Sequence, residues 1–464
     1  MIRLDRFAGR RVDIAAAASV GAAAALLHLP RALTNPFWQD EVASARILRE
    51  PTLGRVLGHV TRTESTPPLW YVIGWAVHRA SVPLVDVRVV SVVCGGAFAA
   101  LVVLFARKLL PSASAVLAGV LVSVGGQFAF ADRELRAYAL LALLAAVFAL
   151  TLAHQLRRPR VAAVAAVTAA GMLTHYFFVF TVAGGLVWLW LEPEARAVRV
   201  RTTTAIAAGV ALTSPWFPYA LRQYRQDRYA WIGPFDAREV VNTPFRLFTP
   251  LVHTEWMPLA FLILVVAGAV RLARRSAYGR LCAALALAPV IGASTLWLAG
   301  ARVYADRNLI GCGGFIAICA IGALPIGLAR IRVAAVVAAG ATAIASFVLV
   351  QTPPTPFAQI ARTLISEGWH SGDPVAVFGS PYSFRSPLEW YLPRAPQLAI
   401  FPSPRCLDEF VVGGRRTVRN LADDISGSRD VGSFVVARAR LDEHLRGESW
   451  LDAPRPTCAR RESG

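Results

Sequence analysis

Residues 35–70, NPFWQDEVASARILREPTLGRVLGHVTRTESTPPLW, form the first long polar interruption after the first apolar segment of the chain. This stretch opens with adjacent carboxylates, Asp40 and Glu41, and closes with two prolines, Pro67 and Pro68. The apolar segments on either side are long enough to cross a bilayer. The alternation predicts a membrane protein whose polar side chains gather in the loops between its helices.

The composition supports a membrane protein over a soluble one. Of the 464 residues, 56% are hydrophobic and 17% are charged, whereas about a quarter of the residues in soluble domains are charged. The net charge of +19 is explained by arginines in the connectors, because Lys and Arg in cytoplasmic loops set membrane orientation. The sequence therefore predicts a polytopic α-helical membrane protein with membrane lipids, and no nucleic acid, as partners.

Eleven apolar segments are predicted to span the bilayer: residues 12–33, 88–105, 113–131, 135–154, 161–174, 177–191, 203–219, 256–270, 281–299, 309–328 and 333–350. Basic connectors at 107–108, 157–160, 196–201, 271–280 and 330–332 follow every second span. The positive-inside rule then places these connectors and the N-terminus in the cytoplasm. The other side holds the loop 34–66, short turns at 132–136 and 175–176, the loop 220–255, the segment 300–308 and everything after residue 351.

Three shorter segments are predicted to lie at the membrane surface. Residues 41–49 and 53–60 have short helical patterns with one apolar face, as interfacial helices do. Residues 68–81 are apolar but too short for a typical span. If they crossed the bilayer, every later basic connector would lie outside, so we expect them to dip into the outer leaflet.

The C-terminal residues 351–464 differ in character from the transmembrane domain 1–350. Alternating patterns predict helices at 357–369, 387–392 and 416–425 and strands at 375–378, 397–401 and 433–437. Such alternation is typical of a small α/β domain, which the predicted topology puts outside the cytoplasm. Cys406 and Cys458 fall in this part, where an oxidising compartment would allow a disulfide.

Asp40 and Glu41 are the first candidates for chemistry. A carboxylate just outside a span can take a proton from a hydroxyl or bind a divalent cation such as Mg²⁺ or Mn²⁺. The alternative is that Asp40 caps a helix that begins at Val42, because Asp is favoured at that position.

A second candidate group surrounds the start of the span at 135–154. Arg133 and Arg136 are three residues apart, which predicts that they share a helix face, with Tyr138 beside them. Arg binds phosphate through paired donors, so this face can hold a phosphate headgroup. The alternative is interfacial Arg side chains that extend to the membrane surface, together with a capping Asp132.

Three further polar groups lie on the same predicted side. His175 and Tyr176 occupy a tight turn, where the imidazole is either functional or a packing residue. Arg302 and Arg307 precede the span at 309–328, and Arg307 either binds a second phosphate oxygen or pairs with Asp306. Aromatic and charged residues alternate in the loop 220–255, as a sugar platform or an interfacial belt.

Taken in order, these motifs resemble the GT-C superfamily of glycosyltransferases. The resemblance rests on the acidic pair Asp40-Glu41, then PPLWY from Pro67, then Arg88, then RELRAY from Arg133. HY at 175–176 and YADRN at 304–308 match later landmarks more loosely. The pattern is similar to that of bacterial dolichyl-phosphate-mannose–protein mannosyltransferases and aminoarabinose lipid A transferases. Where the family often has His before Pro-Pro, this chain has Thr66.

The resemblance implies an inverting transfer of a sugar from a polyprenyl-phosphate carrier to an extracytoplasmic hydroxyl of a protein, lipid or glycan. The sugar would be mannose-like, aminoarabinose-like, or another pentose or hexose. Asp40 would activate the acceptor, directly or with a metal ion, and Glu41 would support it. The leaving phosphate would be stabilised by Arg133, Arg136 and Arg307.

Two other functions are weighed against transfer. One is a transporter or flippase of lipid-linked sugars, and the other is a non-catalytic subunit that presents the C-terminal domain to a partner. A transporter predicts polar residues near the middle of the spans and repeated halves. Here the polar residues gather at one face and no repeat is evident, which favours the enzyme.

Overall fold

The computed structural model describes residues 2–225, 232–249, 256–324, 357–366, 375–378, 390–392, 397–401, 410–413 and 435–438. Within these residues, six helical segments are long and apolar enough to cross a membrane. They are Arg11–Thr34 within α1 (Ile2–Thr34), Asp86–Ala106 (η1 Asp86–Arg88 and α5 Val89–Ala106), α8 (Tyr138–Gln155), α14 (Trp256–Ala273), α15 (Ala277–Leu298) and Asp306–Ala323 (η4 Asp306–Leu309 and α16 Ile310–Ala323). The chain is therefore a multi-pass helical membrane protein, as predicted.

Shorter apolar helices complete the bundle: α6 (Ser112–Val124), α9 (Val161–Thr174) and α10 (Phe178–Leu191). The remaining helices outside the C-terminal part are α2 (Gln39–Leu48), α3 (Leu53–Thr63), α4 (Leu69–Arg79), α7 (Gly126–Ala131), η2 (Pro193–Ala195), α11 (Arg199–Leu212), η3 (Ser214–Trp216), α12 (Phe217–Arg225) and α13 (Ala237–Arg246).

Two predicted spans are interrupted. The segment 113–131 divides into α6 and α7 at Gly125, whose extended backbone (ψ 137°) ends the first helix, and Gly126 N–H then donates to the carbonyl of Phe248 instead of continuing the helix. The segment 203–219 ends as a continuous helix at Leu212, before Pro215, which lacks an N–H to donate. The predicted span 333–350 lies outside the described residues, so the count of eleven stays a prediction.

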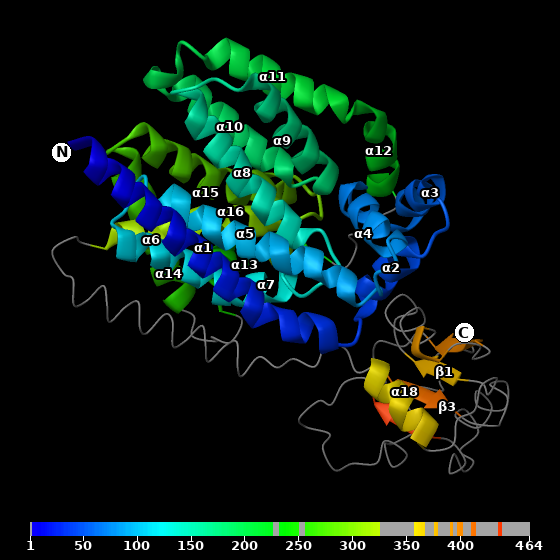
Figure 1. Ribbon diagram of the computed structural model, residues 1–464. Helices are drawn as coiled ribbons and strands as arrows, with labels where there is room; N and C mark the ends of the chain where they lie inside the picture. The colour runs from blue at the N-terminus through cyan, green and yellow to red at the C-terminus, as the bar shows by residue number, and fades with distance from the viewer. Residues whose placement is uncertain are drawn as a thin grey trace. The chain divides into compact units, whose positions relative to one another are not determined.

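Helix α16 lies at the centre of the bundle and α1 at its edge. In the most apolar part of each candidate span, 83% of the residues around α16 are buried, against 22% in α1. Helix α16 packs against α14, α15, α8 and α6, whereas α1 packs mainly against α5 (Figure 1). Glycines bring α1 and α5 together, because a Cβ on Gly21 would lie 2.6 Å from the Gly96 carbonyl oxygen.

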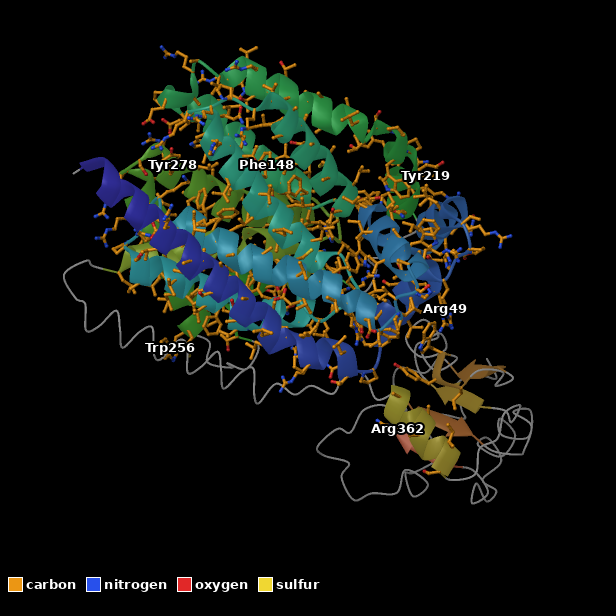
Figure 2. All side chains as sticks on the ribbon, viewed as in Figure 1. Arg49, Phe148, Tyr219, Trp256, Tyr278 and Arg362 are labelled. Atoms are coloured by element: carbon orange, nitrogen blue, oxygen red, sulfur yellow. The ribbon has the colours of Figure 1, made fainter. Side chains whose placement is uncertain are left out.

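Side chains fill the space between these helices (Figure 2). Phe148 of α8 is fully buried, whereas Tyr219 and Trp256 are 42% and 67% exposed. A helix that is apolar all round, such as α16, belongs in the interior of a bundle. The large exposed aromatic side chains belong at its surface.

The short helices after α1 follow the predicted pattern closely. Helices α2 and α3 match the predicted segments 41–49 and 53–60. Helix α4 has 11 residues, a length of about 16 Å at 1.5 Å per residue, which is half the thickness of a hydrocarbon core. It ends at a turn in which Ser81 has a φ of 66°. The length of α4 agrees with a segment that does not cross the bilayer.

The chain divides into two compact units. The first contains Met1–Thr34 and Ile47–Gln351, and the second contains Asn35–Arg46 and Thr352–Gly464. Within the second unit, Tyr391 OH donates to the Phe37 carbonyl at 2.9 Å, and the Phe37 and Trp390 rings pack edge to face. Part of the loop that carries Asp40 therefore associates with the C-terminal part of the chain. The predicted domain boundary at 350–351 lies outside the described residues.

The C-terminal part contains α18 (Phe357–Ser366) and strands β1 (Val375–Phe378), β2 (Gln397–Phe401), β3 (Phe410–Gly413) and β4 (Val435–Arg438). The sheet order is β2-β1-β3-β4, with β1 parallel to β2 and antiparallel to β3. Strand β3 also pairs with β4 antiparallel. The sequence did not predict β3. The predicted helix 416–425, Cys406 and Cys458 lie outside the described residues.

Candidate active site

A buried ionic network lies where α8 begins. Arg136 precedes α8, and its Nη1 donates to Glu64 Oε2 at 2.9 Å and to the Tyr71 hydroxyl at 3.2 Å. Tyr71 OH donates to the same Glu64 oxygen at 2.7 Å, and Thr66 Oγ1 lies 3.0 Å from that hydroxyl. Glu64 and Arg136 are only 4% and 8% exposed. We call Glu64, Thr66, Tyr71 and Arg136 the Glu64–Arg136 network.

The local sequence explains how these side chains meet. Glu64 ends α3, and Pro67 and Pro68 separate α3 from α4, because proline cannot continue the hydrogen bonds of a helix. Pro68 occupies the N-cap position of α4, so Tyr71 lies in the first turn of that helix. Both prolines are buried. In the structure, Pro67 and Pro68 position Thr66 and Tyr71 beside Arg136.

The network holds the Tyr71 phenol in its protonated form. Burial raises the pKa of Tyr71 well above its usual value, so the phenol stays protonated and donates to Glu64. A buried ion pair is stable only when its remaining hydrogen-bonding capacity is also met, and here one carboxylate oxygen accepts from two donors. The guanidinium of Arg136 is thereby held in a fixed orientation.

The buried imidazole of His175 lies near the positive charges of two predicted site residues, Arg136 and Arg307. The imidazole lies in the turn between α9 and α10 and is 4% exposed. Burial, with the positive charges of Arg136 and Arg307, lowers its pKa to about 3. The ring is therefore neutral at physiological pH. Because Nδ1 accepts the Phe177 N–H at 3.2 Å, the proton of the neutral ring is on Nε2.

Tyr138 completes this group. Its ring lies 5.6 Å from the His175 ring, centre to centre, and the Arg307 guanidinium lies 5.9 Å from the centre of the Tyr138 ring. Four of the predicted site residues, Arg136, Tyr138, His175 and Arg307, therefore gather at the start of α8. Two guanidinium groups that act on one buried neutral imidazole make a site prepared for an anion.

Asp306 does not occupy this group. Its carboxylate accepts the Thr243 hydroxyl at 2.6 Å and lies 3.8 Å from Arg246 Nη1, both on α13. The carboxylate of Asp306 therefore contacts α13, and the alternative in which it pairs with the neighbouring Arg307 is not observed among the described residues. Arg302, in the segment before η4, is exposed, and its role in binding stays a prediction.

Arg133 belongs to a different cluster from Arg136. The prediction that the two share a helix face is wrong, because residues 132–137 form a turn and α8 begins at Tyr138. Arg133 Nε donates back to the Ala129 carbonyl at the end of α7. Burial and the charge of Arg31 lower the pKa of Arg133 to about 10.

Asp132 forms the buried centre of this second cluster. Burial raises the pKa of its carboxyl group well above the usual value. A carboxylate oxygen of Asp132 lies 3.6 Å from His28 Nε2 on α1. A Cβ on Gly95 would lie 2.1 Å from the Asp132 carboxyl group, so only glycine allows this approach to α5. Asp132 thus links α1, α5 and the turn before α8, which is more than a helix cap.

The Tyr176 hydroxyl forms hydrogen bonds with two side chains from later in the chain. Its hydroxyl donates to Gln223 Oε1 at 2.5 Å and accepts the Trp216 Nε1–H at 3.0 Å. Gln223 Nε2 in turn donates to the Val60 carbonyl of α3. Tyr176 therefore connects the turn before α10 with α12 and α3, and its predicted role in substrate binding is untested.

The acidic pair occupies the first turn of α2. Helix α2 begins at Gln39, so Asp40 is inside the helix and is not its cap. Glu41 supplies part of the cap instead, because its Oε2 accepts the Trp38 N–H at 3.2 Å. Both carboxylates are favoured there by the positive end of the helix dipole. Their catalytic roles stay predictions, and no group of three or more potential metal-ligating side chains occurs among the described residues.

The sequence did not predict that Glu64 and Tyr71 take part in the Glu64–Arg136 network. Glu64 is 72 residues from its partner Arg136, so the local sequence pattern does not predict this ion pair. The charge of Glu64 could have indicated it, because this carboxylate just before the Thr-Pro-Pro turn is opposite in charge to the arginines predicted on the same side of the membrane.

Comparisons with known proteins agree with this architecture. Residues 65–219 match the family model described as dolichyl-phosphate-mannose-protein mannosyltransferase. The comparison with curated proteins returned no match. The structure is similar to the crystal structure of ArnT from Cupriavidus metallidurans in the apo state, with a TM-score of 0.53 and 12% identity over 89% of this chain and 91% of that one. At this identity the likeness concerns the fold. The matched family segment contains Thr66, Tyr71, Arg136, Tyr138 and His175. The predicted resemblance to dolichyl-phosphate-mannose–protein mannosyltransferases is thus confirmed over residues 65–219, and the fold is similar to that of ArnT.

Proposed function

We propose that this protein transfers a sugar from a polyprenyl-phosphate carrier to an extracytoplasmic hydroxyl group, with inversion at the anomeric carbon. The observation that carries the proposal is the grouping of Arg136, Tyr138, His175 and Arg307 at the start of α8, where the Arg307 guanidinium lies over the Tyr138 ring and that ring lies beside the His175 ring. A pair of cations beside a buried imidazole is suited to a phosphate whose charge grows as its bond to the sugar breaks.

The proposed reaction is a single displacement. The carboxylate of Asp40 takes the proton of the acceptor hydroxyl, and the acceptor oxygen forms a bond to the anomeric carbon. The bond from that carbon to the phosphate oxygen breaks, and the electron pair leaves on polyprenyl phosphate. Asp40 returns its proton to water after the transfer. The leaving charge is stabilised by Arg136 and Arg307, with Arg133 as a further predicted contributor.

Neutral His175 adds a hydrogen-bond donor to this site. With Nδ1 engaged by the Phe177 N–H, the Nε2–H can donate to a phosphate oxygen. A neutral ring is suited to the space beside two arginines, because a third positive charge there would be costly. The Glu64–Arg136 network fixes one of the two guanidinium groups before substrate arrives, which lowers the cost of organising the site.

The proposal also includes the class of sugar and the class of acceptor. The sequence resemblance favours a mannose-like or aminoarabinose-like sugar and a protein, lipid or glycan acceptor. The proposed topology, from the positions of the basic connectors, puts the N-terminus in the cytoplasm and the Arg136 end of α8 on the outer side. A carrier lipid flipped to that side supplies the donor without a nucleotide.

The direct test is a transfer assay with purified full-length protein and radiolabelled polyprenyl-phosphate sugars. We expect label to appear in the acceptor, and Asp40→Asn to abolish this transfer at unchanged expression. The matched control is Glu194→Gln, because the Glu194 side chain is 64% exposed and lies 4.0 Å from Arg280, which is not one of the predicted site residues. Transfer by Asp40→Asn at the wild-type rate would refute the role of Asp40. Movement of label across vesicle membranes without transfer would favour a flippase instead.

Two further experiments test the predicted phosphate contact of Arg307 and the predicted metal site at Asp40. Arg307→Ala is expected to weaken the use of donor more than that of acceptor, with Arg274→Ala as the control at an exposed arginine. A defect confined to the acceptor would count against a phosphate role. The predicted Mg²⁺ or Mn²⁺ site at Asp40 requires that activity falls on chelation with EDTA and returns when the metal is added back.

A further inference from the structure

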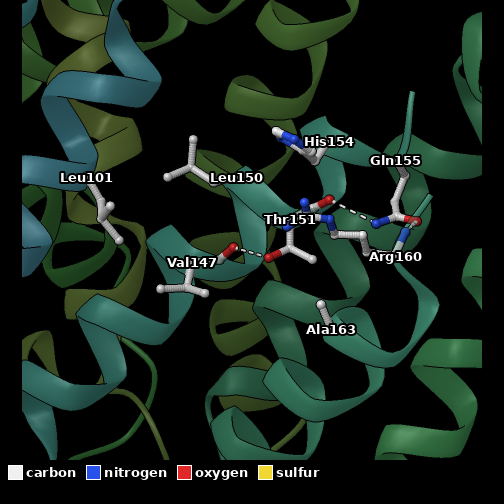
Figure 3. A pocket seen from close by; sticks show the side chains of 8 residues that line it. All are labelled: Leu101, Val147, Leu150, Thr151, His154, Gln155, Arg160 and Ala163. Carbon is white, nitrogen blue, oxygen red and sulfur yellow. Dashed lines mark hydrogen bonds between the residues drawn. The ribbon is translucent and has the colours of Figure 1, made fainter. Parts of the chain in front are cut away.

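A groove opens at the other end of α8, away from the candidate active site. It has a volume of about 240 Å³ and lies between α5, α8 and α9 (Figure 3). Leu101, Val147, Leu150 and Ala163 give it apolar walls, and each of these side chains is half-buried. In a membrane such a half-exposed apolar groove is filled by an acyl chain, since hydrocarbon is the solvent that surrounds it.

The polar groups inside the groove are satisfied by the protein. Thr151 Oγ1 donates to the Val147 carbonyl at 2.7 Å, and Gln155 Nε2 donates to the Thr151 carbonyl at 3.2 Å. Gln155 Oε1 also accepts the backbone N–H of Arg160 at 3.0 Å. Gln155 is 1% exposed, so it fixes the backbone of Arg160 at the mouth of the groove (Figure 3).

The mouth of the groove is cationic. His154 and Arg160 line the groove, and Lys108, Arg157 and Arg158 also carry positive charge near the His154 imidazole. All five side chains are exposed. Among the described residues, no carboxylate forms an ion pair with Arg157, Arg158 or Arg160. Within the part of the chain that the structure describes, the charges of Arg157, Arg158 and Arg160 are therefore not neutralised by a carboxylate.

The groove and the candidate active site are separate. His154 follows Tyr138 by 16 residues of continuous helix, which corresponds to roughly 24 Å at 1.5 Å per residue. That distance is close to the thickness of a hydrocarbon core. The two sites therefore lie toward opposite surfaces of the membrane.

We propose that this groove binds an anionic phospholipid. One acyl chain lies along Leu101, Val147, Leu150 and Ala163, and the phosphate of the headgroup lies against the side chains of residues 157–160 and His154. The basic connector lies on the side that the positive-inside rule assigns to the cytoplasm, where anionic lipids attract basic residues. Apolar walls below a cationic rim match the two chemical parts of such a lipid. The proposal does not depend on the function proposed above.

The test is native mass spectrometry of the full-length protein with phosphatidylglycerol and with phosphatidylcholine of identical acyl chains. We expect the protein to retain phosphatidylglycerol preferentially. Arg157→Gln/Arg158→Gln/Arg160→Gln should weaken that binding by on the order of 100-fold, because each basic residue adds roughly a factor of five near an anionic headgroup. The matched control Arg196→Gln/Arg274→Gln/Arg275→Gln removes three exposed arginines from other connectors and should change binding little.

A second variant tests the acyl-chain part of the groove. Ala163→Phe fills the groove without changing its charge, and should reduce phosphatidylglycerol binding while the size-exclusion profile is unchanged. An excess of inorganic phosphate should not displace the lipid, because phosphate lacks the acyl chain. Equal retention of the two lipids, equal loss in both triple variants, or displacement by inorganic phosphate would each overturn the proposal.

Discussion

The two ends of α8 carry arginines in opposite circumstances. At the start of the helix, Arg136 is 8% exposed and bonded to Glu64 and Tyr71. At the other end, Arg157, Arg158 and Arg160 are exposed, of like charge, and without a partner carboxylate among the described residues. The first arrangement fixes one cation in a buried site, and the second presents several exposed cations to the membrane surface.

Whether an arginine is buried or exposed determines what its charge can do. A buried arginine is tolerated only with a partner, and the partner then fixes its orientation for a substrate. An exposed group of arginines contributes little to folding and attracts anions without fixed geometry. The net charge of the chain is thus composed of charges with different roles, and the following variants separate them.

Removal of Glu64 should have the largest effect. Glu64→Ala leaves the Arg136 charge buried without its carboxylate, which we expect to cost about 3–5 kcal/mol in the free energy of unfolding. Unfolding in mixed detergent micelles measures this change. Glu194→Ala is the control, because that side chain is 64% exposed and 4.0 Å from Arg280, and it should cost less than about 1 kcal/mol. Equal effects of the two variants would show that burial of the first pair is unimportant.

Loss of the Tyr71 hydroxyl should come next. Tyr71→Phe removes one donor to Glu64 and the hydrogen bond with Thr66, which should cost about 1–3 kcal/mol in stability. The same unfolding assay applies, with Tyr219→Phe as a control at a side chain that is 42% exposed. If Tyr71→Phe were as stable as the wild type, the hydroxyl would not be part of the network that holds Arg136.

The pH dependence of stability should report on His175. Its pKa is lowered to about 3 in the folded protein, whereas an unperturbed His titrates near 6.5. Between these values the unfolded state binds a proton that the folded state does not, so stability falls as pH falls. From pH 6.5 to 5.5 the His175 contribution should fall by about 1 kcal/mol, and little is lost above about pH 7.5.

The comparison of two variants isolates this contribution. His175→Gln should show a shallower loss of unfolding free energy on acidification than the wild type. Thr204→Val changes an exposed side chain that carries no titratable group and should keep the wild-type slope. An unchanged slope in His175→Gln would mean that the His175 ring titrates alike in the folded and the unfolded protein.

The exposed end of α8 should matter least for folding. In detergent without anionic lipid, Arg157→Gln/Arg158→Gln/Arg160→Gln should change the free energy of unfolding by no more than about 0.5 kcal/mol. The same unfolding assay measures it, beside Glu64→Ala. A loss comparable to that of Glu64→Ala would erase the distinction between the two ends of the helix.

Much of the architecture follows from the sequence because hydrophobic length is a local property. The short helices α2, α3 and α4 and most long spans were predicted within a few residues. The face shared by Arg133 and Arg136 was predicted wrongly, because the apolar pattern of α8 continues back through Leu135 without Gly or Pro to signal the turn. The segment 113–131 reads as one helix because its apolar pattern continues on both sides of Gly125 and Gly126, although Gly125 ends α6.

The candidate site was predictable in its charges and not in its pairings. Arg136, His175 and Arg307 are recognisable because each lies at the end of an apolar segment on one predicted side. Glu64 is not, since its partner is 72 residues away and the ion pair exists only after α3, α4 and α8 pack. The capping role of Glu41 was likewise hidden, because it depends on α2 beginning at Gln39 and not at Val42.

The most direct test is an experimental structure of the full-length protein in a lipid nanodisc with bound polyprenyl phosphate. We expect the phosphate to lie within hydrogen-bond distance of the Arg136 or Arg307 guanidinium, at the start of α8. A phosphate found instead at Arg157–Arg160, or at neither end of the helix, would rule out the proposed phosphate site at Arg136 and Arg307.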